Sequence, residues 1–120
     1  MRKKMKTANL NLNDGFLQCY RDKSKKSDFN APKNPKTLED MEFIVELAFG
    51  EMSKRDQDLA FAETLGRNLS LKVKTRLVEE AVDKKCKVVI NGCLYDTIKI
   101  DYSKQDNLMY FYLEEVRKLA

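Results

Sequence analysis

The feature that most constrains this chain is a hydrophobic pattern of period two that begins at residue 41. Apolar side chains occupy every second position: Met41, Phe43, Val45, Leu47 and Phe49. Glu42, Ile44, Glu46 and Ala48 lie between them. The preceding Thr37–Asp40 resembles a helix capping box, but five successive matches to alternation favour a strand. We therefore predict a strand over 41–49 that buries the odd-numbered side chains on one face.

A second alternating segment covers residues 69–77. Leu69, Leu71, Val73 and Leu77 alternate there with Ser70, Lys72, Lys74 and Arg76. A helix would scatter these cations around its surface, whereas a strand places them all on one side. This pattern predicts a strand whose basic side chains face water.

Three further strands follow, and one precedes. Asn91-Gly92 separates Lys87–Ile90 from a β-prone segment over 93–102, and this dipeptide is the strongest short signal for a hairpin. Alternation over 109–113 predicts the last strand. We predict the first strand over residues 16–20.

Two segments lack the alternating hydrophobic pattern of the predicted strands. Residues 22–37 combine Lys, Ser and Asn with two prolines, which predicts a long basic loop. Residues 53–65 carry apolar side chains at helical spacing, with Ser53 as the expected cap and Gly66 as the expected stop.

These segments add up to a mainly β protein: a small six-stranded barrel or sandwich with one crossover helix and a long basic loop. The length of 120 residues fits one hydrophobic core. We expect residues 1–12 to form a flexible basic arm and residues 13–120 a single β-barrel domain.

Charge is distributed unevenly along the chain. Residues 1–36 hold ten Lys or Arg against three acidic residues, a net +7, while the whole chain has a net charge of +4, which leaves −3 for the rest. Such an arm can contact DNA phosphates or an acidic neighbour, or it can be a solvated tail that only aids solubility. The candidates for such contacts in the arm and loop are Arg2, Lys3, Lys4, Lys6, Lys23, Lys25, Lys26, Lys33 and Lys36.

The residue inventory argues against an enzyme and against a metal site. His is absent, the four glycines do not cluster, and the adjacent carboxylates would point to opposite faces of a strand. Cys19, Cys86 and Cys93 form no C-x-x-C pair, which predicts reduced thiols in a reducing cytoplasm. We expect no catalytic residues and no cofactor, and no apolar run is long enough to predict a membrane segment.

From Phe43 to Leu113 the order of segments resembles the head-closure (stopper) proteins of long-tailed bacteriophages. The corresponding pieces are Phe43–Phe49, Ser53–Ala62, Leu69–Arg76, Val88–Tyr95 and Ile98–Asp101. Tyr95 and Ile98 lie one residue further apart than in the family pattern, which leaves the register of the fifth strand open.

This resemblance implies a structural protein of the virion neck, assembled in the host bacterial cytoplasm. Such proteins form a ring, dodecameric in the virion, beneath the portal and adaptor; they close the DNA exit channel and present a docking surface to the tail. Their segment between the second and third strands faces the channel. In this chain the channel-facing candidates are Lys54, Arg55 and Gln57.

Two other functions stay open. One is a different neck component, an adaptor or tail-completion protein. The other is a small nucleic-acid-binding barrel of the OB or Sm-like kind, because tyrosines on a barrel can stack bases. The tyrosines concerned are Tyr95, Tyr102, Tyr110 and Tyr112. They can equally fill a barrel wall or a subunit contact.

Overall fold

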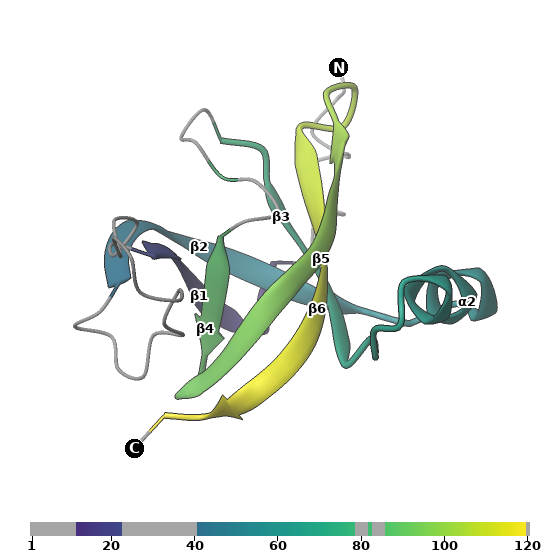
Figure 1. Cartoon of the computed structure of the whole chain (residues 1–120). Coiled ribbons are helices and arrows are strands. Elements are labelled where there is room, and N and C mark those ends of the chain that lie inside the picture. The colour runs from purple at the N-terminus through teal and green to yellow at the C-terminus, as the bar shows by residue number, and fades with distance from the viewer. Residues whose placement is uncertain (1–11, 23–40, 79–81, 83–85, 120) are drawn as a thin grey trace.

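The structure is a computed structural model that describes residues 12–22, 41–78, 82 and 86–119 (Figure 1). It contains six strands and one helix. The elements are β1 (Gly15–Asp22), β2 (Met41–Met52), α2 (Asp56–Thr64), β3 (Leu71–Arg76), β4 (Lys87–Ile90), β5 (Cys93–Ser103) and β6 (Leu108–Lys118).

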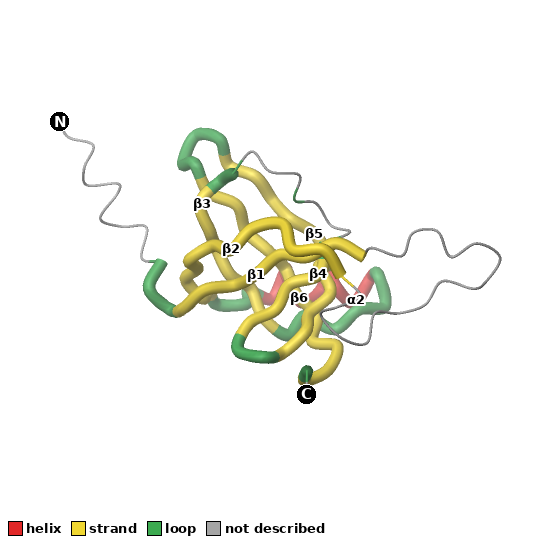
Figure 2. Tube along the Cα trace, turned by 90° about the vertical axis from the view of Figure 1, so that its left-hand side faces the viewer, coloured by secondary structure: helices red, strands yellow, loops and turns green. Residues whose placement is uncertain are grey.

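The strands close into one antiparallel barrel in the order β1-β2-β3-β6-β5-β4. Figure 2 shows the strands wrapped around a common interior, and Figure 1 shows α2 to one side of them. Each described strand has a paired neighbour on both sides along part of its length, although β1 meets β4 only at Gln18–Tyr20 and β2 meets β3 only at Gly50–Met52. The predicted fold class is confirmed, and the structure selects the barrel over the sandwich.

The interior of the barrel is filled by apolar side chains and two thiols. Its buried members are Leu17, Cys19, Leu47, Phe49, Val73, Val82, Cys86, Val88, Ile90, Met109, Phe111 and Leu113. Burial, reinforced by the nearby Cys86, raises the pKa of the Cys19 thiol to about 12. The Cys19 thiol is therefore a neutral packing group near pH 7.

The β4–β5 hairpin forms where the sequence predicted it. Asn91 and Gly92 have φ of 50° and 75°, the left-handed conformation that a two-residue turn of this kind requires. Ile90 pairs with Cys93 immediately beside the turn.

The prediction that residues 41 and 43 face the interior is wrong. Residues Cys19 and Tyr20 of β1 pair with Val45 and Phe43, so Ile44 is an extra residue in β2. This bulge reverses the alternation beyond it. Phe43 lies exposed outside the barrel with its ring 5.7 Å from that of Tyr20.

Met41 lies beyond the same bulge and belongs to a separate small cluster with Val89 and Leu94. Val89 follows Val88, which faces the interior, so this cluster is on the outer surface. A second bulge lies at Ile98 of β5, between the pairs of Thr97 and Lys99. This second bulge lies in the fifth strand, whose register could not be decided from the sequence.

The prediction that the polar side chains of 69–77 all face water is wrong for one residue. Val73 is interior, so Lys72 and Lys74 both lie on the outer wall. Arg76 is exposed and Lys74 is half-buried, but Lys72 is almost fully buried. The reason is that α2 covers this part of the wall.

The helix is shorter at both ends than predicted. Arg55, and not Ser53, is the residue that caps its N-terminus. After Thr64 the chain leaves the helix, and Gly66 has φ of 70°, as expected of a glycine stop. The amide of Arg67 donates a hydrogen bond back to the Ala62 carbonyl.

Some predictions fall on residues outside the described part of the chain. They are the flexible arm over 1–12, apart from its last residue, most of the basic loop over 22–37, and all nine basic contact candidates of these segments. Within the described residues no helix is long and apolar enough to cross a bilayer.

Candidate functional site

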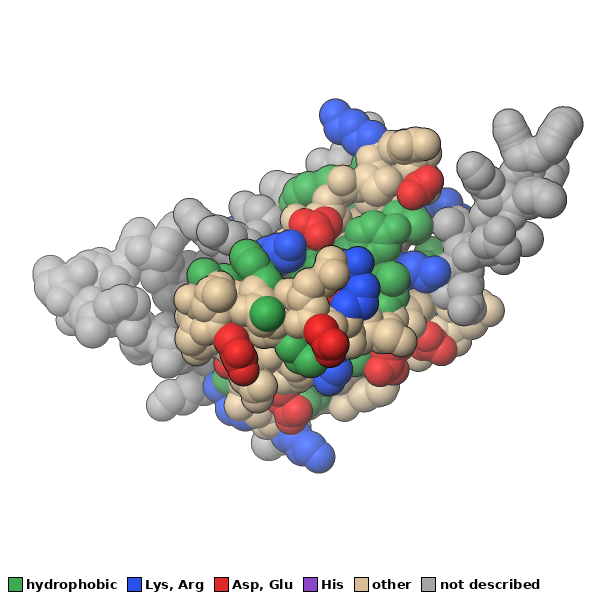
Figure 3. Space-filling model, turned by 90° about the vertical axis from the view of Figure 1, so that its right-hand side faces the viewer, with side chains coloured by type: hydrophobic (Ala, Val, Ile, Leu, Met, Phe, Trp, Pro, Cys, Tyr) green, Lys and Arg blue, Asp and Glu red, His purple; other side chains and the backbone are tan. Residues whose placement is uncertain are grey.

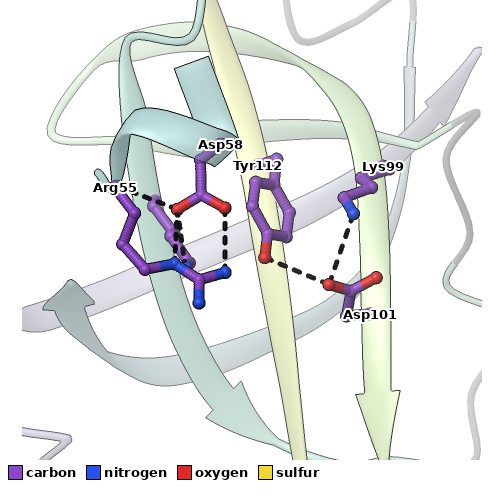
Figure 4. A network of polar contacts seen from close by, with 6 residues as sticks. Arg55, Asp58, Lys99, Asp101 and Tyr112 are labelled. Carbon is purple, nitrogen blue, oxygen red and sulfur yellow. Dashed lines mark hydrogen bonds and ion pairs between the residues drawn. The ribbon is translucent and has the colours of Figure 1, made fainter. Parts of the chain in front are cut away.

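The most unusual part of the described structure is the contact between α2 and the barrel. Phe111 and Leu113 face the interior, so Tyr112 between them faces outwards, under the helix. Ala62 of α2 packs there with Leu69, Ile98 and Tyr112. This apolar contact is small, and polar groups surround it. We call Arg55, Asp58, Lys72, Lys99, Asp101 and Tyr112 the docking cluster (Figure 4).

Asp58 is the centre of the docking cluster. Its side chain and that of Lys72 are each only 5% exposed, and Lys72 Nζ lies 2.9 Å from Asp58 Oδ2. Arg55 adds two hydrogen bonds from its guanidinium, at 3.2 and 3.0 Å, and one from its backbone amide at 3.0 Å. The carboxylate therefore joins the residue before the helix, the helix itself and β3.

The electrostatic environment keeps Asp58 ionised. Hydrogen bonds from Arg55, together with the charge of Lys72, hold the pKa of the Asp58 carboxyl well below its usual range, although burial acts in the opposite direction. A buried carboxylate that is paired and hydrogen-bonded in this way is stable as an anion. Removing one partner would leave the other charge buried without compensation.

A second set of contacts joins α2 to β5 and β6. Lys99 Nζ lies between two rings, 4.5 Å from the centroid of Phe61 on α2 and 4.6 Å from that of Tyr112 on β6. Asp101 accepts a hydrogen bond from the Tyr112 hydroxyl at 3.0 Å and pairs with Lys99 at 3.5 Å. Burial, and then the hydrogen bond to Asp101, raises the pKa of Tyr112 to about 12. Tyr112 is thus a neutral donor held against the helix.

Polar contacts also fix the chain on both sides of the helix. Lys54 Nζ donates to the Ser70 carbonyl at 3.1 Å. After the helix, Arg67 forms an ion pair with Glu114 of β6, which also accepts a hydrogen bond from the Asn68 amide at 3.1 Å. The whole segment from 54 to 70 is therefore attached to the barrel mainly by charges and hydrogen bonds.

The three channel-facing candidates lie close together at the start of the helix. Lys54 and Gln57 are exposed. Arg55 is bound to Asp58, yet its side chain is still 56% exposed. The resemblance made Arg55 a candidate for channel contact, which stays a prediction, and the structure shows in addition that Arg55 is bound to Asp58.

Sequence reasoning missed the other members of the docking cluster. Asp58 had a signal, because an acidic residue at the third helical position commonly binds the backbone at the helix start. Lys72 and Lys99 had none, because a cation in an alternating strand normally faces water. Their burial arises only when α2 covers the wall.

The four tyrosines that could stack bases do not share one face. Tyr95 packs against the interior cluster, while Tyr110 and Tyr112 pack under α2. Tyr102 is exposed and donates to the Val82 carbonyl at 2.9 Å. Across the described ranges, no group of three His, Cys, Asp or Glu side chains is arranged to hold a metal ion. What the docking cluster provides is attachment of a helix to the barrel wall by ion pairs, hydrogen bonds and cation–π contacts.

Comparison of the sequence with protein-family models finds no match, and comparison with the curated proteins finds none.

Proposed function

We propose that this chain is a structural protein of a bacteriophage neck. It would join the filled head beneath the portal and adaptor, close the DNA exit channel as a ring of copies, and offer a docking surface to the tail. The proposal rests on the resemblance of Phe43–Leu113 to head-closure proteins and on the way α2 is attached.

The observation that carries the proposal is a helix held outside a closed barrel by polar contacts. A protein that plugs a channel needs a segment that changes position while the rest of the subunit keeps its fold. Among the described residues, the interior cluster includes none from α2, and the helix is joined to the wall by the buried ion pair Asp58–Lys72 and the small apolar contact at Ala62. The helix can leave its wall without opening the barrel.

The length of α2 supports the same interpretation. A helix of nine residues is marginal by itself in water, so its position depends on what it packs against. Lys54, Arg55 and Gln57 at its start provide cations and an amide for DNA or for an acidic neighbour. Closure of the channel requires no chemistry beyond such contacts.

The proposal is tested with heads of the phage whose genome encodes the chain. DNA-filled heads that lack this protein and tails are incubated with the purified chain, and DNA retention and tail attachment are measured. We expect nuclease-resistant DNA and tail-competent heads only after the chain is added. A portal or capsid gene a few reading frames upstream would be the accompanying genomic sign.

Matched variants connect the assay to the proposed segment. Lys54→Glu combined with Gln57→Glu should lower DNA retention. Lys104→Glu, an exposed site in the turn between β5 and β6, should leave it unchanged. Equal retention with and without the chain, together with strongly salt-dependent binding of an oligonucleotide by the monomer, would contradict the neck role and support the nucleic-acid-binding alternative.

A further inference from the structure

The wall beneath α2 carries a row of charged and aromatic side chains that the sheet itself aligns. Tyr112 of β6 pairs directly with Lys72 of β3 on one side and with Lys99 of β5 on the other. Lys72 Nζ lies 5.0 Å and Lys99 Nζ 4.6 Å from the centroid of the Tyr112 ring. Strand pairing therefore places one cation on each side of a single ring. We call Lys72, Tyr112 and Lys99 the wall row.

The two cations of the wall row are neutralised from different parts of the chain. Asp101, which belongs to β5 of the barrel, pairs with Lys99 at 3.5 Å. Lys72 pairs at 2.9 Å with Asp58, which is supplied by α2. Figure 4 shows Asp58 and Lys99 on either side of Tyr112. Without α2, Lys72 would face water on the outer wall, and a carboxylate from another chain would find there the charge that now binds Asp58.

The face of α2 that meets the wall row presents three groups. Asp58, Phe61 and Ala62 occupy positions i, i+3 and i+4, which lie on one face of a helix. Asp58 binds Lys72. The Phe61 ring lies 4.5 Å from Lys99 Nζ, and Ala62 fills the small apolar contact on the wall. The wall thus receives a carboxylate, an aromatic ring and a small apolar side chain from one helical face.

The insertion that carries α2 begins and ends at paired residues. Met52 of β2 pairs with Lys72 of β3, so displacement of the helix breaks no pair between these strands. A helix of nine residues is marginal by itself in water. Because α2 is tethered to the wall, it competes at high effective concentration with any helix from another protein. Figure 3 views this side of the molecule, where charged side chains of both signs lie beside hydrophobic ones.

We propose that the wall row is a binding site for an acidic helical segment of a partner protein, and that α2 occupies this site in the free chain. The partner segment carries Asp or Glu, an aromatic residue three positions later and a small residue directly after it. A nucleic acid would offer phosphates to the cations but no counterpart of the helix packed at Ala62. The binding site does not depend on the neck function; in a neck, the displacement would be the event that releases α2.

Peptide binding to the full chain tests the proposal. The probe is a fluorescent peptide with the sequence of residues 53–67, and the chain carries Asp58→Ala, which removes the tethered carboxylate. This variant should bind the peptide at least about tenfold more tightly than the unmodified chain, because docked α2 lowers the fraction of chains that can accept it. Titration followed by NMR should place the largest shifts at the wall row. Asp58→Asn, which keeps the volume of the side chain, is the second variant.

Changes in the peptide identify the groups that the wall receives. The peptide variant Asp58→Asn should bind about tenfold more weakly, since it loses a charged hydrogen bond. Asp56→Asn, at an exposed acid of the same turn, should bind unchanged. A chain with Lys72→Glu should lose the original peptide and accept the peptide variant Asp58→Lys.

Three outcomes would overturn the inference: equal binding by the Asp58→Ala and unmodified chains, binding that survives Lys72→Glu, and displacement of the probe by an oligonucleotide as readily as by unlabelled peptide. Absence of NMR shifts in both Asp58 variants at millimolar peptide would overturn it as well. Peptide binding by a chain that does not close heads would contradict only the neck function, and head closure without peptide binding would contradict only this site.

Discussion

The barrel interior and the docking cluster are both buried, but they are built from opposite kinds of side chain. The interior cluster consists of apolar residues and two buried thiols, and every strand contributes to it, β5 through the partly buried Tyr95 and Ile100. The docking cluster joins α2 to the wall through Asp58, Lys72 and Arg55, with only a small apolar contact at Ala62. Apolar burial is non-directional, and its stabilising free energy is lost when the apolar surface is exposed to water. An ion pair depends on both partners and on their geometry.

This difference implies that the barrel interior and the docking cluster are stabilised separately. Loss of an interior side chain should affect the whole barrel at once, since each strand contributes to one core. Loss of a charge in the docking cluster should affect α2 first. Five measurements test whether the two regions respond separately.

The largest effect is expected from Phe111→Ala. Phe111 is fully buried in the interior, and truncating such a ring costs about 3–5 kcal/mol of the free energy of unfolding. Denaturant unfolding followed by circular dichroism should show one cooperative loss of the barrel. Val116→Ala, at a largely exposed position of the same strand, should cost far less. Similar costs for both variants would mean that the interior cluster is not the stabilising core.

The next largest effect is expected from Asp58→Ala, and it should be local. The variant leaves Lys72 buried without its partner, a change that costs about 3–5 kcal/mol. Hydrogen exchange should show amides of 56–64 losing more than about 100-fold in protection, while β1 and β4 keep theirs. Asp56→Ala changes an exposed acid in the same helical turn and is the matched control. Equal loss of protection in all strands would show that helix and barrel unfold together.

A double replacement should reverse most of that loss. Asp58→Leu with Lys72→Met removes both buried charges and keeps similar volumes, and such replacements are often neutral or stabilising. Exchange of the α2 amides should return to within about tenfold of the unmodified chain. A helix that remains unprotected would show that the pair supplies the specific geometry of docking, which apolar packing does not replace.

A smaller effect is expected from Lys99→Met. The side chain keeps its stem between Phe61 and Tyr112 but loses the cation, and a cation–π contact of this kind contributes about 0.5–1 kcal/mol. Protection of α2 should fall only a few-fold. A loss as large as that of Asp58→Ala would mean that Lys99 contributes as much as Asp58 to holding the helix on the wall.

The smallest effect is expected from pH between 5 and 8. The folded pKa of Asp58 lies below its ordinary value of about 3.9. Its contribution is therefore fully present above about pH 5 and is lost as the pH falls through the folded value. After correction for intrinsic exchange, α2 protection should be flat from pH 8 to 5 and should fall before that of the barrel below about pH 4. A decline between pH 8 and 5 would contradict this assignment.

The sequence predicted the barrel well because its signals are local. Alternation marked the strands, and Asn91-Gly92 marked the hairpin with its positive φ angles. It failed at Phe43 because the bulge at Ile44 depends on pairing with β1, which the pattern of one strand does not contain. It failed at Lys72 because that side chain is buried by the docking of α2, a tertiary contact that the alternation of a single strand does not contain. The channel-facing role of residues 54–57 stays a prediction from the resemblance, and the docking cluster beside them could be recognised only from the fold.

The register of β2 and β3 has a consequence for how such proteins diversify. Met52 pairs directly with Lys72, so everything between them is an insertion into what would otherwise be an ordinary hairpin. Evolution, or a protein engineer, can exchange this insertion for one of another length or sequence, provided that the replacement meets the wall at Lys72 and Tyr112. The pairing of β2 with β3 would then hold the ends of the exchanged segment in place.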